Sequence, residues 1–76
     1  MTKIDKIAQA ILQNRPTSFA DAERLLKRLG FEVIACGSHH VFRKRGYMRN
    51  VSLKKRSELL PYQIRDIKEV LIDHGY

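Results

Sequence analysis

The stretch from Gly37 to Lys44 joins two of the three histidines to the start of the densest run of positive charge in the chain. An imidazole can give or take a proton near neutral pH, because its unperturbed pKa lies there. Arg and Lys side chains neutralise the phosphates that would hold RNA in place. These residue types together suit metal-free cleavage of RNA, with His39 as the candidate catalytic residue. The Gly37-Ser38 step can turn the chain tightly and place His39 at the start of a strand.

Metal-free cleavage of RNA needs a base for the 2′-hydroxyl proton and an acid for the leaving 5′-oxygen. His40 is a candidate for a second proton-transfer group, although a regular strand directs it to the face opposite His39. Tyr47 is a candidate for stacking on a base. Gly37 and Ser38, which precede His39, complete the auxiliary candidates.

Cations follow His39 in two groups, one around a predicted hairpin and one after the next strand. We expect them to contact RNA phosphates and to stabilise the charge that develops during cleavage. The alternative is a solvated hairpin tip that needs cations only for solubility. The candidates are Arg43, Lys44, Arg45, Arg49, Lys54, Lys55 and Arg56.

The length of 76 residues predicts one domain with a small core. Fifteen Lys and Arg against eight Asp and Glu give a net charge of +7, which favours nucleic acid, an anionic membrane surface or an acidic protein as partner. Cys36 is the only cysteine, so we expect no disulfide and interpret Cys36 as a small apolar strand residue. No metal-ligand spacing, membrane span or secretory signal is found, so we expect no metal, no small-molecule cofactor, no membrane partner and a cytoplasmic location.

Apolar residues with a helical period predict three helices. The first covers residues 3–14, with a cap pattern at Thr2 and Asp5 and a stop at Pro16. The second covers residues 18–29 and ends at a glycine. The last begins near Pro61, with a core face predicted to hold Leu60, Ile64, Ile67 and Leu71.

Three short strands are predicted between the second and the last helix, over residues 31–36, 39–44 and 49–54, with a hairpin turn at Arg45-Gly46. Val51 and Leu53 are expected to face the helices. In the middle strand the pattern leaves the buried face open, because Val41 and Phe42 point to opposite sides.

Several short segments resemble one family in their order and spacing. They are Gly37-Ser38-His39 with Phe42 three residues later, Leu29-Gly30-Phe31 after a helix, Val51-Ser52-Leu53, and Glu58-Leu59 followed by Pro61 and Ile64. Together they resemble the HicA toxins of bacterial toxin–antitoxin systems. The resemblance implies an α+β fold like that of double-stranded-RNA-binding domains, in the order α-β-β-β-α, with helices on one face of a three-stranded antiparallel sheet. It also implies that His39 is catalytic and that a HicB-like antitoxin is the partner.

The resembling region leaves residues 1–16 as an N-terminal helical extension and residues 17–76 as the family-like domain. The leading hypothesis is a small endoribonuclease toxin that cleaves mRNA. The alternatives are a non-catalytic RNA-binding or antitoxin-binding module on the same fold, and a basic partner for an acidic protein with no RNA role.

Overall fold

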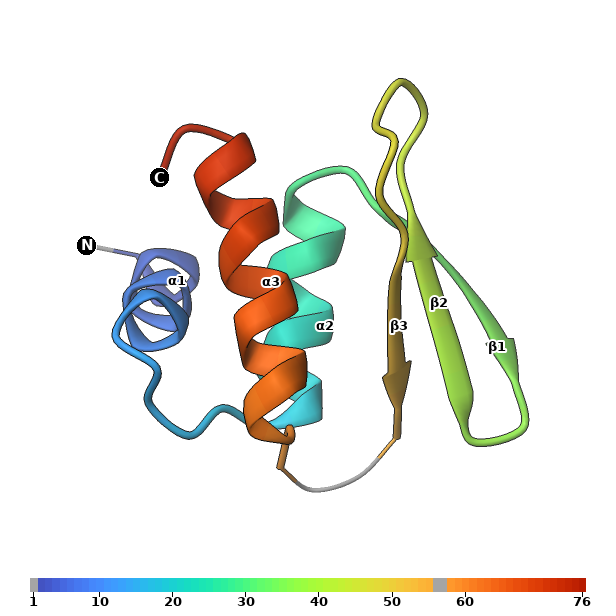
Figure 1. Ribbon diagram of the computed structural model, residues 1–76, viewed down its shortest axis with the longest axis horizontal. Coiled ribbons are helices and arrows are strands. Elements are labelled where there is room, and N and C mark those ends of the chain that lie inside the picture. The colour runs from blue at the N-terminus through green and yellow to red at the C-terminus, as the bar shows by residue number, and fades with distance from the viewer. Residues whose placement is uncertain (1, 56–57) are drawn as a thin grey trace.

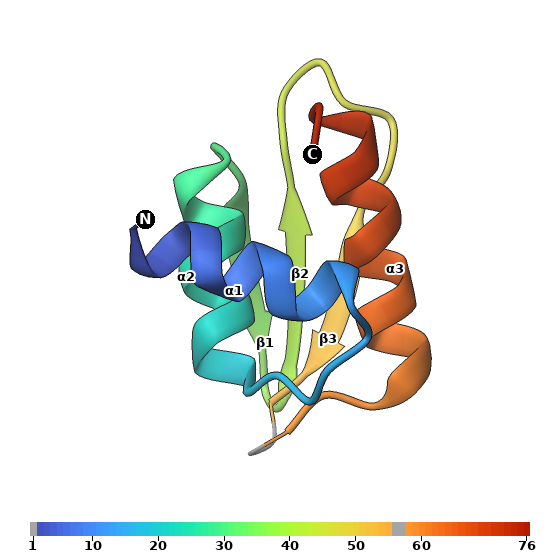
Figure 2. The same cartoon turned by 90° about the vertical axis from the view of Figure 1, so that its left-hand side faces the viewer.

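The chain forms three layers in the computed structural model, which describes residues 2–55 and 58–76. Helix α1 (Lys3–Leu12) lies on one side, helices α2 (Phe19–Arg28) and α3 (Pro61–Asp73) form the middle layer, and a three-stranded sheet lies on the other side (Figure 1). Figure 2 shows that α1 crosses the outer side of both middle helices. The predicted α+β architecture with helices on one face of the sheet is therefore confirmed.

The first two helices begin at the caps that the sequence predicts. The Thr2 hydroxyl accepts the Asp5 backbone N–H, the Asp5 carboxylate accepts the Thr2 N–H, and the Ser18 hydroxyl accepts the Asp21 N–H. Helix α1 ends earlier than expected, because Asn14 adopts the left-handed conformation at φ 57°. The Arg15 N–H then closes the helix on the Ala10 carbonyl, so the stop precedes Pro16.

The start of α3 differs from the prediction in which residue it buries. Leu60 was expected on the core face, but its backbone is extended and its side chain is 36% exposed. It is the residue before the helix, so the helical period does not extend to it. Gln63 is buried instead at 2% exposure, and its Oε1 accepts the Leu60 N–H at 2.8 Å.

The sheet has the order β1 (Glu32–Cys36), β2 (His39–Arg43) and β3 (Val51–Lys54), all antiparallel. Strand β2 is shorter than predicted by one residue and β3 by two, so the loop of residues 44–50 replaces a tight hairpin. Arg45 and Gly46 lie at the centre of the predicted turn within this loop, which the Tyr47 N–H closes on the Lys44 carbonyl at 3.1 Å.

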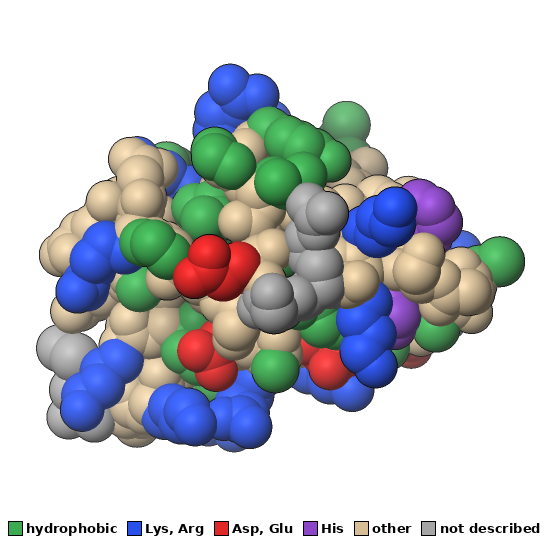
Figure 3. Space-filling model, turned by 90° about the horizontal axis from the view of Figure 1, so that it is seen from below, with side chains coloured by type: hydrophobic (Ala, Val, Ile, Leu, Met, Phe, Trp, Pro, Cys, Tyr) green, Lys and Arg blue, Asp and Glu red, His purple; other side chains and the backbone are tan. Residues whose placement is uncertain are grey.

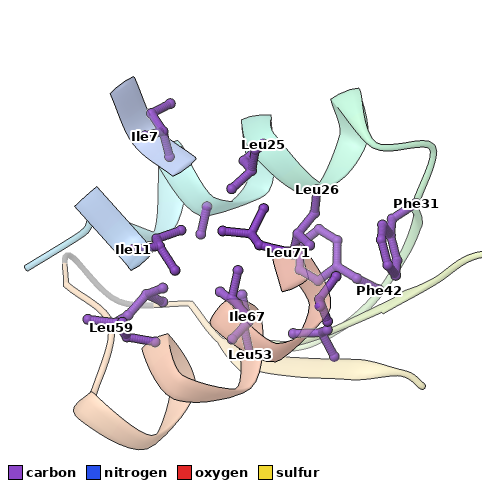
Figure 4. Packing of buried hydrophobic residues seen from close by; sticks show 14 of the residues in the cluster. Ile7, Ile11, Leu25, Leu26, Phe31, Phe42, Leu53, Leu59, Ile67 and Leu71 are labelled. Carbon is purple, nitrogen blue, oxygen red and sulfur yellow. The ribbon is translucent and has the colours of Figure 1, made fainter. Parts of the chain in front are cut away.

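The ladder decides which face of β2 is buried. Phe42 is 0% exposed and pairs with Val33 and Val51, which also face the helices. His40 shares this face, whereas His39, Val41 and Arg43 lie on the face without helices, named here the open face. A single core joins all three layers (Figure 4), and its buried apolar side chains include Ile7, Ile11, Leu25, Leu26, Phe31, Phe42, Leu53, Leu59, Ile67 and Leu71.

Candidate active site

His39 is the first residue of β2 and lies on the open face with its side chain exposed. The turn before it consists of Gly37 and Ser38 alone, and Gly37 has a φ of 62°, which suits the first position of a two-residue hairpin turn. The same ladder pairs His39 with Cys36. Cys36 lies in β1, in agreement with its interpretation as a strand residue, and it is exposed because the odd–even alternation of β1 directs it to the open face.

Lys54 lies beside His39 on the other neighbouring strand. The two residues are paired in the β2–β3 ladder, and both are exposed on the open face. Side chains paired in this way have Cβ atoms about 5 Å apart. Lys55 follows directly, and its N–H donates to the Ser38 carbonyl at 2.7 Å, which holds the end of β3 against the β1–β2 turn. Figure 3 shows histidine side chains at this end of the molecule with Lys and Arg side chains beside them.

His40, the auxiliary candidate, faces the helices. Its ring packs edge-on against Phe19, with centroids 5.0 Å apart. Its Nδ1 is buried and has no hydrogen-bond partner among the residues that the structure describes. His40 and His39 therefore lie on opposite faces of the sheet, and the structure does not bring the two imidazoles together.

His74 has both ring nitrogens engaged. Its Nδ1 lies 2.8 Å from the Val70 carbonyl, and its Nε2 lies 3.0 Å from Lys44 Nζ. Both contacts are hydrogen bonds if Nδ1 carries the proton and Nε2 accepts from the lysine. His74 thus caps the end of α3 and at the same time holds Lys44.

The candidate cations separate to the two ends of the sheet. Lys54 and Lys55 lie at the same end of the sheet as His39. Arg45 and Arg49 lie in the loop at the opposite end (Figure 1). Along β2, His39 and Arg43 are roughly 13 Å apart, since a strand advances about 3.3 Å per residue. Arg43 is exposed and paired with Glu32. Arg56 lies outside the described residues.

The loop of residues 44–50 is fastened to the last turn of α3. Arg49 forms ion pairs with Glu69 and Asp73, and the Tyr47 hydroxyl donates to Asp73 Oδ2 at 2.7 Å. Burial, together with the hydrogen bond to Asp73, raises the pKa of Tyr47 to about 12. The hydrogen bond to Glu69 raises the pKa of Arg49. Both side chains are thus engaged within the protein.

Glu69 and Asp73, the two carboxylates that hold this loop, were not among the site residues predicted from the sequence. Their spacing of four residues was a signal, because it places both on one face of a helix. Their partners could not be read from that spacing, since Arg49 and Tyr47 are 20 and 26 residues away along the chain.

Residues 2–55 and 58–76 contain no group of three or more His, Cys, Asp and Glu side chains placed to hold a metal ion. In the same part of the chain, no helix has both the length and the apolar character needed to cross a membrane.

Comparison with known proteins adds one finding. Residues 19–75 match the model of a family described as HicA toxin of bacterial toxin-antitoxin systems. The match covers α2, the sheet and α3 and leaves α1 outside. No curated protein and no solved structure matches the chain.

Proposed function

The chain belongs to the HicA toxin family of bacterial toxin–antitoxin systems, and on this premise we propose that it is an endoribonuclease that cleaves mRNA. His39 is the catalytic residue, and a HicB-like antitoxin neutralises the enzyme in the cytoplasm. This proposal keeps the division into a helical extension, residues 1–16, and a catalytic domain, residues 17–76.

The observation that carries the proposal is the contrast among the three histidines, all of which lie within the described residues. His74 uses both ring nitrogens inside the protein, and His40 packs against Phe19. His39 alone of the three is exposed on the open face, next to a lysine on the neighbouring strand. An accessible imidazole beside a cation is the arrangement that phosphodiester chemistry needs.

The reaction is transfer of the phosphoryl group to the adjacent 2′-oxygen. As a base, His39 takes the 2′-hydroxyl proton while the 2′-oxygen attacks phosphorus; the bond from phosphorus to the 5′-oxygen breaks, and that oxygen takes a proton from water. As an acid, a protonated His39 gives its proton to the 5′-oxygen instead, and water takes the 2′-hydroxyl proton. Either route leaves a 2′,3′-cyclic phosphate and a free 5′-hydroxyl. Lys54 stabilises the charge that builds on the phosphate oxygens.

The open face also defines a path for the substrate. RNA that runs from His39 along β2 meets Arg43 roughly 13 Å away and then the loop of residues 44–50. At about 3.4 Å per stacked nucleotide, that distance corresponds to roughly four nucleotides. We therefore assign the cleavage site to the His39 end and a second phosphate contact to the loop end.

The antitoxin is proposed to cover the open face around His39. That face carries exposed apolar area at Ile34, which is 47% exposed, between the cations at its two ends. An acidic partner with an apolar centre would match this pattern, and its charge would speed association with a chain of net charge +7. In the complex, the amides of β1 and β2 should exchange more slowly and His39 should lose its access to solvent. A complex that leaves His39 open would contradict this assignment.

The deciding experiment is an RNA cleavage assay with analysis of the product ends. The parent protein should yield 2′,3′-cyclic phosphates, and His39→Ala should lose about 100- to 10,000-fold in rate, the range of general acid–base catalysis. Cys36→Ser is the matched control, because it changes the paired residue on the same face and should retain cleavage. Equal cleavage by His39→Ala and the parent would refute the catalytic assignment.

The separation of His39 from His40 favours one alternative, an RNA-binding or antitoxin-binding module without catalysis, because His40 cannot supply a second imidazole on the open face. A parent protein that binds RNA with a steep salt dependence but yields no cleavage products would support this alternative.

A further inference from the structure

The loop of residues 44–50 has an inner side that contacts α3 and an outer side that does not. Figure 2 shows the loop and the C-terminal turn of α3 at the same end of the molecule. The inner side chains are those of Lys44, Tyr47 and Arg49, whose partners are His74, the residue that caps α3, and Asp73 and Glu69 within α3.

Asp73 holds two of these three side chains at once. Its Oδ2 accepts the Tyr47 hydroxyl at 2.7 Å and lies 3.6 Å from Arg49 Nε. The Tyr47 ring is also packed edge-on between Phe31 and His74, with centroids 5.7 and 5.0 Å away. Tyr47 is therefore fixed at its ring by packing and at its hydroxyl by Asp73, which lies in the last turn of α3.

This inward fixing leaves other side chains of the loop directed to solvent. Arg45 is exposed, and Met48 is 98% exposed, the largest exposure among the large apolar residues that the structure describes. A single exposed apolar residue needs no explanation by itself. Met48, however, lies on a loop that a helix holds in place, and Arg45 and Arg49 belong to the same loop. An apolar side chain at this position can pack against an unstacked base.

We propose that Asp73 is a positioning residue of the substrate-contact loop: it fixes residues 44–50 so that Arg45 meets a phosphate and Met48 meets a base several nucleotides from the cleaved bond. The proposal rests on the proposed RNA-cleaving function and goes beyond it, because Asp73 does not touch the substrate. Its effect is to keep the loop in the geometry that binds.

The sign of the charge change gives this proposal a sharp test. Asp73→Asn removes a negative charge from a chain of net charge +7, so simple electrostatics would strengthen RNA binding. A loop released from α3 would instead adopt the binding conformation in only a fraction of the molecules. If that fraction is between about a third and a tenth, the affinity for RNA falls about three- to tenfold. The two effects have opposite directions.

Asp66→Asn is the matched control. Asp66 lies on the same helix, is exposed, and makes no ion pair or hydrogen bond among the side chains of the described residues. The Asp66→Asn substitution makes the same change in charge as Asp73→Asn but removes no contact with the loop. Both variants are built with His39→Ala, so that a fluorescently labelled single-stranded RNA is bound and not cleaved. Hydrogen exchange of the Tyr47 amide, which is bonded to the Lys44 carbonyl, reports on the loop without RNA.

We expect Asp66→Asn to bind the RNA as tightly as the parent or more tightly, and Asp73→Asn to bind about three- to tenfold more weakly, with faster exchange of the Tyr47 amide. Tyr47→Phe removes the hydroxyl contact alone and should change both measurements in the same direction, which keeps the test valid if Asp73→Asn does not fold.

Similar behaviour of Asp73→Asn and Asp66→Asn in both measurements would overturn the proposal. Faster exchange with unchanged affinity would overturn the RNA contact of the loop. If the parent binds no RNA at low salt, the proposed function is overturned, and exchange still decides whether Asp73 holds the loop.

Discussion

His39 and Lys54 occupy paired positions on β2 and β3, and both side chains are exposed on the face of the sheet that no helix covers. The pairing brings a group that can transfer a proton and a group that can neutralise a phosphate to the same end of the sheet. Lys55, the next residue, lies beyond the end of β3, and its backbone N–H donates a hydrogen bond to the Ser38 carbonyl.

This pairing predicts different effects for two neighbouring lysines. Lys54→Ala should lower the cleavage rate at saturating RNA by about tenfold or more, because a charge beside the reacting phosphate is lost. Lys55→Ala should weaken RNA binding and leave that rate nearly unchanged. Single-turnover cleavage and binding measured on the same RNA separate the two effects. Equal rate losses in both variants would contradict a special role of Lys54.

His40→Phe should preserve cleavage and stabilise the fold. The substitution removes the buried Nδ1 that has no partner in the described part of the chain, and it keeps an aromatic ring against Phe19. An unsatisfied buried polar atom costs about 1–3 kcal/mol, so we expect a gain of about 1 kcal/mol in the free energy of unfolding. Denaturant unfolding and the cleavage assay check the two parts, and a loss of cleavage with an intact fold would show that His40 takes part in the reaction.

Alkaline pH should loosen the loop through Tyr47. The pKa of Tyr47 rises from 10.0 to about 12 on folding, because of burial and the hydrogen bond to Asp73. The folded state thus holds this proton more tightly than the unfolded state, so its contribution to stability is complete below pH 10 and is lost as the pH rises toward 12. Ultraviolet titration should show one late-ionising tyrosine that is absent from Tyr47→Phe. The same late component in that variant would disprove the assignment.

Two arginines of the loop should differ in the salt dependence of RNA binding. Arg45 is exposed, so Arg45→Ala should lower the slope of log affinity against log salt by about 0.7 for single-stranded RNA. Arg49 is already paired with Glu69 and Asp73, so Arg49→Ala should weaken binding with little change in slope. Equal slope changes would mean that Arg49 leaves its carboxylates when RNA binds.

Helix α1 should stabilise the domain although it lies outside the family match. Ile11 is 0% exposed and belongs to the same core as α2 and α3. Ile11→Ala should lower the free energy of unfolding by about 2–5 kcal/mol, a large part of the roughly 4–11 kcal/mol expected for a chain of 76 residues. Gln9→Ala on the exposed side of α1 is the control and should change stability by less than about 0.5 kcal/mol. A small effect of Ile11→Ala would mean that α1 is only loosely attached.

Local chemistry along the chain was enough to predict the order of the elements and the place of His39. Cap pairs such as Thr2 with Asp5 act within one helical turn, and the Gly37-Ser38 turn acts within one hairpin, so both can be read from neighbouring residues. The same local signals gave element ends that were wrong by one or two residues, because helix and strand ends depend on bonds that reach further along the chain.

Other features were decided by contacts between residues far apart in the sequence. The alternation in β2 fits burial of either Val41 or Phe42, and only pairing with Val33 and Val51 selects Phe42. The cations that the sequence groups after His39 separate in the fold, because β2 carries the loop roughly 13 Å from the catalytic candidate. The partners of Arg49 lie on a helix 20 residues later, and a pairing at that distance has no period or local pattern from which it could be predicted.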